Sequence, residues 1–456
     1  MSFQLVQTIN RDGNVSLDEF DVKNKLFITP NALLGIRSNA NSRIDVDMNV
    51  VMKLFNIAEN FDSFSGVYFP LESWRAIRKK MDVKQQMFLR GANFNEKILL
   101  LPTVEAVYYG LDKRMEKQLK LLKPNYPSIP DYYRGYRNFL GRNKSSAVAY
   151  CNWLPNINRN LRNYVFDFLR FQHNENVFFL IPPTPPIFDL ERDLDYAERT
   201  FQIAQDFLAA TFDDQESDEI DPLCIFIPIS IRSFKTTEAT RNGTEKLKMI
   251  LSNLNPDIVL VKIFDETLKK DQVKENLKGL EFFCRKIIEY CKRNKKMSGI
   301  IDTKEYGHIL LYKGLNFVGI PVNRHSEGIS LGGSKSGPPP RNQWKVLDPE
   351  TRDEIPFLNY QNKVRQIRNR GGFMGNRAPL PYLTGLRRIY NRDNIQNLSL
   401  TAQNEFAKLT PLITASKDIS ELKNAIIEGN VRNIIARFSR NPSNHATKVR
   451  ILLNEE

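Results

Sequence analysis

Eight short apolar runs, each bounded by turn residues, recur between residues 25 and 322 of this chain. They are apolar throughout rather than alternating, which is typical of strands covered on both faces in a parallel sheet. Helical patterns lie between several of them, at 195–212, 244–256 and 276–296. The eight runs are 25–30, 65–71, 97–103, 177–183, 222–230, 257–265, 298–302 and 317–322.

Strands that alternate with helices indicate βαβ units, and eight such strands predict an α/β fold of the (β/α)8 barrel type. The alternation is most regular from residue 177 onward, and an open doubly wound sheet is the alternative. Proline cannot donate to a strand ladder, so we expect pairing to end near the prolines of these runs. These prolines are Pro30, Pro70, Pro102, Pro182, Pro228 and Pro321.

The pattern changes after residue 328, where the stretch 330–344 is rich in Gly, Ser and Pro. From about Ser399 the sequence is helical again, with a break at Gly429. We therefore predict a barrel over 1–328, an irregular basic insertion over 329–398, and C-terminal helices over 399–456 that complete the barrel domain. The whole would be a TIM-like barrel with a basic, mostly α-helical C-terminal extension.

The formal charge of the chain is +14, and residues 363–392 contain eight basic residues and no acidic one. Aromatic residues Phe373, Tyr382 and Tyr390 lie among them, and arginine with aromatics is the combination that holds nucleic acid by charge and stacking. We expect RNA or DNA as a partner; a solvated basic face or a protein interface are the alternatives. The basic residues are Lys363, Arg365, Arg368, Arg370, Arg377, Arg387, Arg388 and Arg392.

The four cysteines form no CxxC pair, which favours buried free thiols in a reducing compartment. No apolar run approaches the roughly 20 residues of a bilayer helix, and the N-terminus has no secretory pattern. These features predict a cytoplasmic protein without a membrane partner, and they leave the oligomeric state open. The sequence also has no HxH or HExxH motif, so neither a metal nor another cofactor is predicted.

Titratable residues follow several of the predicted strands, at the end of a barrel where active sites form. Neighbouring strands lie roughly 5 Å apart, so side chains from consecutive strands can meet. We expect the catalytic residues among Asp302, Asp265, Glu305 and His325. Arg324, Glu327, Arg232 and Lys304 are the candidates for substrate binding. For each residue taken alone, a loop salt bridge is the alternative.

The stretch "SELKNAIIEGNVRNIIARFSRNP" (420–442) resembles the closing helices of tRNA-guanine transglycosylases. That family has a (β/α)8 barrel with an insertion after the last strand, and irregular sequence follows the last predicted strand here as well. The resemblance implies base exchange on a nucleic acid, with Asp302 in the place of the nucleophile. Residues 328–398 contain no cysteine or histidine, so the zinc site of the family is not expected.

Three functions remain open from the sequence. The first is a nucleic-acid-modifying barrel enzyme, a pentosyltransferase acting by glycosyl transfer on a base. The second is a non-catalytic nucleic-acid-binding protein on a barrel scaffold, and the third is a small-molecule barrel enzyme. The first requires the runs 257–265, 298–302 and 317–322 to be adjacent and parallel, because only then can their polar ends meet.

Overall fold

The computed structural model describes most residues of the chain, and the fold is the arrangement of these residues. These are 3–36, 44–57, 63–91, 97–103, 113–140, 149, 152–153, 160–212, 220–234, 237–264, 270–302, 307–322, 345–347, 354–362 and 400–439.

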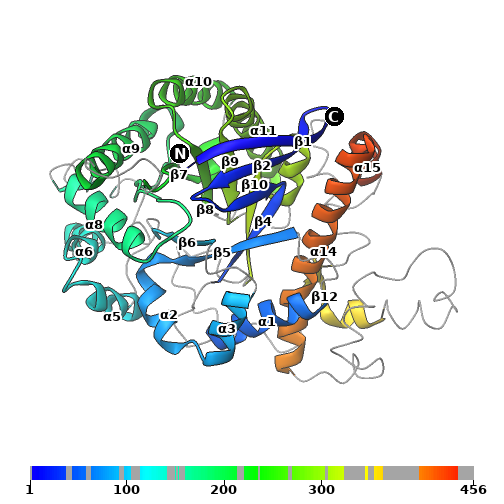
Figure 1. The fold of residues 1–456 in the computed structure, drawn as a ribbon, viewed down its shortest axis with the longest axis horizontal. Coiled ribbons are helices and arrows are strands. Elements are labelled where there is room, and N and C mark those ends of the chain that lie inside the picture. The colour runs from blue at the N-terminus through cyan, green and yellow to red at the C-terminus, as the bar shows by residue number, and fades with distance from the viewer. Residues whose placement is uncertain are drawn as a thin grey trace, which may run out of the picture.

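The centre of the fold is a seven-stranded parallel sheet that curls into a half-barrel (Figure 1). Its strand order is β6-β5-β4-β10-β9-β8-β7. The strands β8, β9 and β10 are adjacent and parallel, as the site prediction requires. The strands are β4 (Asn31–Gly35), β5 (Phe64–Pro70), β6 (Ile98–Leu101), β7 (Cys224–Ser230), β8 (Ile258–Phe264), β9 (Met297–Ile301) and β10 (Phe317–Pro321).

The first predicted strand is wrong in position, whereas six of the others coincide with β5 to β10. Residues 25–30 overlap β3 (Leu26–Thr29), which belongs to a separate antiparallel sheet, and the first parallel strand begins after Pro30. The reason is burial: Leu26 and Ile28 are exposed, so this run alternates between solvent and core. Apolar residues on both faces of the run concealed that alternation.

The segment 177–187, predicted to contain a strand at 177–183, forms isolated bridges instead of a ladder. It nevertheless bonds to both edge strands of the sheet. The Phe178 amide donates to the Ile98 carbonyl of β6 at 2.9 Å, and the Ser230 amide of β7 donates to the Ile187 carbonyl at 3.0 Å. The prolines at 182, 183, 185 and 186 have no amide hydrogen, which explains why no continuous ladder forms here.

Proline marks the end of pairing at some strands and not at others. Pro70 and Pro321 are the last residues of β5 and β10, as predicted. Pro228 instead lies inside β7, opposite Lys262 of β8. Its carbonyl accepts from the Ile187 amide, so its nitrogen also faces the irregular segment 177–187. This segment forms no continuous ladder with β7, so the missing amide hydrogen of Pro228 breaks no ladder bond.

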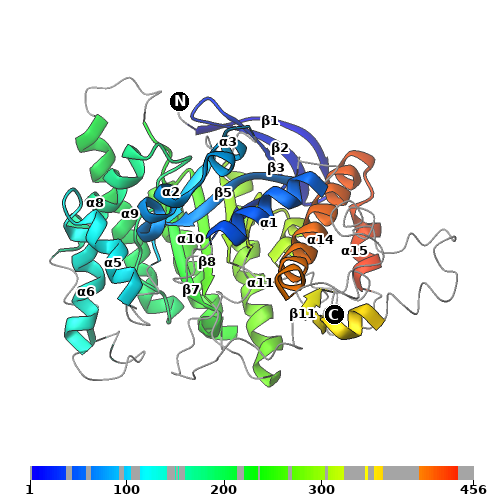
Figure 2. The same cartoon turned by 90° about the horizontal axis from the view of Figure 1, so that it is seen from below.

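Helices surround the outside of the curled sheet (Figures 1 and 2). The predicted helices at 195–212 and 276–296 are confirmed as parts of α9 and α11. The third predicted helix begins earlier than expected, so Gly243 lies inside α10, where a Cβ would be 2.5 Å from the Cβ of Leu190. The helices on this part of the chain are α1 (Ile44–Ile57), η2 (Leu71–Ser73), α2 (Trp74–Lys80), α3 (Val83–Gly91), α5 (Lys113–Leu122), α6 (Ser128–Leu140), α8 (Leu161–Asn174), α9 (Leu190–Phe212), η5 (Ile231–Phe234), α10 (Thr237–Leu254), α11 (Lys270–Arg293) and η6 (Gly307–Lys313).

A three-stranded antiparallel sheet packs against the amino ends of the parallel strands. It consists of β1 (Phe3–Asp12), β2 (Val15–Val22) and β3. The ring of Phe27 contacts the rings of Phe178 and Phe317, and the Asn316 side chain donates to Thr29. The small sheet therefore covers the end of the curl opposite to the predicted site.

The C-terminal helices return to the N-terminal half of the fold (Figure 2). α14 (Leu400–Glu428) ends at Gly429, whose φ of +68° suits a residue without a side chain, and α15 (Val431–Ser439) follows. The Ser63 hydroxyl donates to the carbonyl of Ser416, and Asp12 accepts from the Val431 amide. A two-stranded sheet, β11 (Lys345–Leu347) with β12 (Glu354–Pro356), lies beside α14.

Candidate functional site

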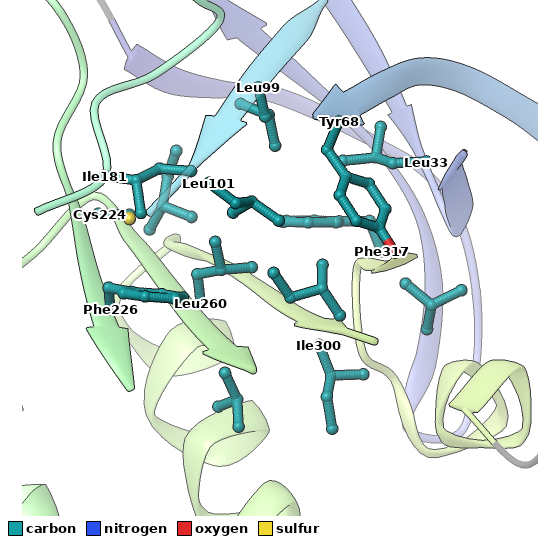
Figure 3. Close-up of a cluster of buried hydrophobic side chains, with 14 of the residues drawn as sticks. Leu33, Tyr68, Leu99, Leu101, Ile181, Cys224, Phe226, Leu260, Ile300 and Phe317 are labelled. Carbon is teal, nitrogen blue, oxygen red and sulfur yellow. The ribbon is translucent and has the colours of Figure 1, made fainter. Parts of the chain in front are cut away.

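The inside of the curl is filled by apolar side chains from neighbouring strands. Phe226, Leu260, Gly299 and Phe317 occupy paired positions on β7, β8, β9 and β10. The Phe317 ring covers Gly299, where a Cβ would be 2.1 Å from the ring. Figure 3 shows Phe226, Leu260 and Phe317 gathered with other apolar side chains and with Tyr68. This layer forms the floor beneath the carboxyl end of the sheet.

Lys262 places a charge one layer above this floor. It lies two residues after Leu260 on β8 and therefore points to the same face of the sheet. Its Nζ lies 3.4 Å from Oδ2 of Asp302, and both side chains are 3% exposed. A charged group this deep requires a partner, and Asp302 provides one.

Asp302, the predicted nucleophile, follows the last residue of β9. Its φ of +60° is left-handed, a conformation that is uncommon outside glycine, asparagine and aspartate. Its amide donates to the Gly319 carbonyl of β10 at 3.1 Å. The strand thus ends in a backbone turn at Asp302, whose carboxylate is buried against Lys262.

Tyr68 of β5 reaches the same carboxylate from a strand that is separated from β9 by two other strands. Its hydroxyl donates to Oδ1 of Asp302 at 3.0 Å. Strands β4 and β10 lie between β5 and β9, and the ring crosses Gly35 of β4 and Gly319 of β10. Side chains from β5, β8 and β9 meet because the sheet curls. We call Lys262, Asp302 and Tyr68 the central polar cluster.

A second polar group lies at the carboxyl ends of β5 and β6. Glu72 is buried and accepts hydrogen bonds from the amide and hydroxyl of Thr103, at 2.8 and 2.7 Å, and from the hydroxyl of Tyr133 on α6. Burial raises the pKa of Glu72 above its ordinary value, although these three donors act in the opposite direction. Glu72 ties the end of β5 to β6 and α6, so we assign it a structural role.

Arg232, predicted to bind substrate, lies on η5 directly after β7 and is half-buried. Its amide donates to the Ser230 hydroxyl at 3.2 Å. The neighbouring Ser233 hydroxyl donates to the Phe188 carbonyl at 2.9 Å and so anchors η5 to the segment that precedes α9. Arg232 is therefore at the carboxyl end of the sheet, directly after β7, as the sequence predicted.

The remaining candidates lie outside the described residues. They are Asp265, Glu305, His325, Arg324, Glu327 and Lys304, together with the basic residues from Lys363 to Arg392. Within the part of the chain that the structure describes, no group of three or more His, Cys, Asp or Glu side chains could hold a metal ion. Among those same residues, none of the helices has the length and apolar character needed to cross a bilayer.

Sequence reasoning missed Lys262 and Tyr68, and one signal was available for the first. Lys262 is the charged residue inside the apolar run "IVLVKIF", and a lysine on a doubly covered strand needs a buried partner. Tyr68 gave no such signal, because its contact with Asp302 depends on the strand order. The three described cysteines, Cys224, Cys284 and Cys291, are free and buried, as predicted.

The comparisons with known proteins add no relative to this picture. No family model matches the chain, and no curated protein matches it either.

Proposed function

We propose that this chain is a nucleic-acid-modifying enzyme that exchanges a base by glycosyl transfer, with Asp302 as the nucleophile. The observation that supports the proposal is the central polar cluster: a buried carboxylate at the carboxyl end of β9, contacted by a cation from β8 and a hydroxyl from β5. The carboxyl end of a curled parallel sheet is where barrel enzymes carry out chemistry. Buried ion pairs often add little net stability. Stability alone therefore does not explain the ion pair at this place, and a role in chemistry does.

The proposed reaction has two displacements at the sugar carbon C1′. A carboxylate oxygen of Asp302 forms a bond to C1′ while the bond from C1′ to the base nitrogen breaks. The departing base keeps the bonding pair and takes a proton from water. An incoming base then attacks C1′ through a ring nitrogen, loses its proton to water, and releases the Asp302 carboxylate.

Two further features belong to the same proposal. The first is a closed (β/α)8 barrel, in which the segment 177–187 takes the place of the remaining strand; its bonds to both β6 and β7 support this. The second is the basic stretch 363–392, which would hold the nucleic-acid backbone by charge and by stacking. The resemblance of residues 420–442 to the closing helices of tRNA-guanine transglycosylases supports base exchange as the reaction.

The test is incorporation of radiolabelled guanine into unfractionated tRNA, with total RNA and single-stranded DNA as parallel substrates. We expect incorporation into one of them by the parent protein, and at least a thousandfold slower incorporation by Asp302→Asn. Asparagine keeps the size and the left-handed preference of the residue but cannot act as the nucleophile. A protein–nucleic acid adduct that survives denaturing electrophoresis should form with the parent and be absent with Asp302→Asn.

Two other outcomes would replace the proposal. Salt-dependent binding of nucleic acid without incorporation would favour a non-catalytic binding protein, with the ion pair as part of the core. Absence of both binding and incorporation would favour an enzyme that acts on a small molecule at the same cluster.

A further inference from the structure

We propose that Tyr68 is a positioning residue, which fixes the plane of the Asp302 carboxylate through its hydroxyl, and that Gly35 is a glycine because the Tyr68 ring must cross it. The reaction assigned to Asp302 rests on the proposed function. The positioning itself does not, because it concerns a contact within the folded chain.

The Tyr68 ring runs across glycines of β4 and β10. A Cβ on Gly35 would lie 2.2 Å from the Cζ of Tyr68. A Cβ on Gly319 would lie 2.4 Å from the Cγ2 of Ile301 and 2.9 Å from the Cε1 of Tyr68. Contacts below 3.0 Å are not compatible with a real Cβ, so a residue larger than glycine at either position would displace the ring. Glycine within a strand is less favourable than alanine. At Gly35 it has a clear purpose in the passage of Tyr68, whereas Gly319 also makes room for Ile301.

The plane of the Asp302 carboxylate needs a directional contact to hold it. The last torsion of an aspartate side chain has a broad, roughly two-fold preference, so packing alone does not fix the carboxylate plane. Lys262 lies 3.4 Å from Oδ2, and an ammonium group acts as a point charge with little directional preference. The Tyr68 hydroxyl contacts the other oxygen, Oδ1, at 3.0 Å and prefers a defined direction. Contacts on both oxygens, one of them directional, hold the plane.

The ring and the hydroxyl of Tyr68 have separate roles. The ring fills the inside of the curl, and a phenylalanine would fill the same volume. A buried hydroxyl needs a partner, and here its partner is the carboxylate of the proposed nucleophile. A nucleophile displaced by 1 Å or rotated out of line can lose about a hundredfold in rate. The hydroxyl is thus the part of Tyr68 that bears on chemistry.

The decisive variant is Tyr68→Phe, which keeps the ring and removes the hydroxyl. In the incorporation assay we expect kcat to fall by about 10- to 100-fold, while KM for the nucleic acid stays within about twofold of the parent. Tyr312→Phe is the matched control, since Tyr312 is equally buried and donates to the Asp418 carbonyl on α14. It should leave both constants unchanged. An unchanged kcat in Tyr68→Phe would overturn the positioning role and leave the proposed function standing.

A second measurement needs no substrate. In protein labelled with ¹³C at aspartate carboxyls, the signal of Asp302 is assigned by its disappearance in Asp302→Asn. We expect this signal to shift in Tyr68→Phe and to stay in place in Tyr312→Phe. If the signal shifts but the parent protein shows no incorporation, the shift supports the positioning and the missing incorporation refutes the proposed function. A signal that does not move would refute the positioning.

The glycines provide a third variant. Gly35→Ala should displace the ring and reproduce the loss of kcat seen with Tyr68→Phe. When both substitutions are combined, the loss should be close to that of Tyr68→Phe alone, because the same hydrogen bond is removed in each case. If the two losses multiply instead, Gly35 acts independently of the Tyr68 hydroxyl, and that part of the proposal is wrong.

Discussion

At the scale of single residues, the pair of Lys262 and Asp302 makes a specific energetic prediction. Lys262→Met should lower the free energy of unfolding by about 3 kcal/mol, because it removes the buried cation that contacts the Asp302 carboxylate. The double variant Lys262→Met/Asp302→Asn should be more stable than the single one by about 2 kcal/mol, since it removes both charges. Urea unfolding of the parent, both single variants and the double variant gives the coupling between the two positions.

The control for this cycle is Lys296→Met with Asp257→Asn, a pair on the amino side of β8 and β9 whose Asp257 is 37% exposed. The coupling there should be below about 1 kcal/mol. A coupling at Lys262 and Asp302 as small as in the control pair would mean that the two charges do not depend on each other.

The place of Asp302 at the end of a strand could be predicted from the sequence, whereas its contacts with Lys262 and Tyr68 could not. An acidic residue directly after an apolar run is visible by eye, and β9 does end at Ile301, immediately before Asp302. Lys262 lies within a run, where its charge looked like an interruption of the strand and not like part of a site. Tyr68 comes from β5, and its approach to Asp302 depends on the order β5-β4-β10-β9 and on two glycines. None of these can be deduced from local pattern.

At the scale of elements, a polar cluster around the buried Asp221 joins the small antiparallel sheet to the amino end of the parallel one. Asp221, just before β7, contacts Nδ1 of His173 on α8 at 2.6 Å and Nζ of Lys23 after β2 at 2.5 Å. Burial of Asp221 opposes its ionisation, but the His173 hydrogen bond and the Lys23 charge outweigh burial, so the pKa of Asp221 is lowered. The cluster thus connects three elements distant in sequence.

This cluster makes the stability of the fold depend on pH in a defined way. The folded-state pKa of Asp221 is below the ordinary value of 3.8, so its stabilisation is complete above that value and is lost as the pH falls through the folded-state pKa. Asp221→Asn should therefore unfold more easily than the parent by about 1–3 kcal/mol at pH 7. The difference should shrink below pH 4, as urea titrations at several pH values would measure. A difference that stays constant down to pH 3 would contradict the role of the ionised carboxylate.

The elements themselves were predictable where burial is uniform. Runs apolar on both faces gave β5 to β10, and helical spacing gave α9 and α11. The failures have local causes: Leu26 and Ile28 are apolar but exposed, and four prolines prevent a ladder within 177–187. Hydrophobicity alone does not report exposure, so the position of the first strand could only come from the tertiary structure.

At the scale of the whole molecule, the charge distribution predicts how nucleic acid would be held. Four of the basic residues outside the described part, Arg365, Arg368, Arg370 and Arg377, can be changed together to glutamine. If all four contact phosphates of a single strand, the slope of log K against log salt should become less steep by about 3. Fluorescence anisotropy with a labelled single-stranded oligonucleotide over a range of salt concentrations measures the slope.

The matched control changes four exposed cations elsewhere, Lys79, Lys80, Lys120 and Arg199, to glutamine. This variant has the same net charge as the first, and its slope should stay close to that of the parent. Equal slopes for both variants would show that the basic stretch attracts the polyanion only through the overall charge of the protein.

The order of the strands also has a consequence for folding during synthesis. β4 and β10 are neighbours near the middle of the sheet, yet one is made early and the other late in synthesis. Until β10 has been synthesised, one edge of β4 has no partner strand. The unpaired backbone N–H and C=O groups on that edge can then pair with other chains. Such non-local pairing slows folding, so we expect the newly synthesised protein to depend on chaperones until β4 and β10 have paired.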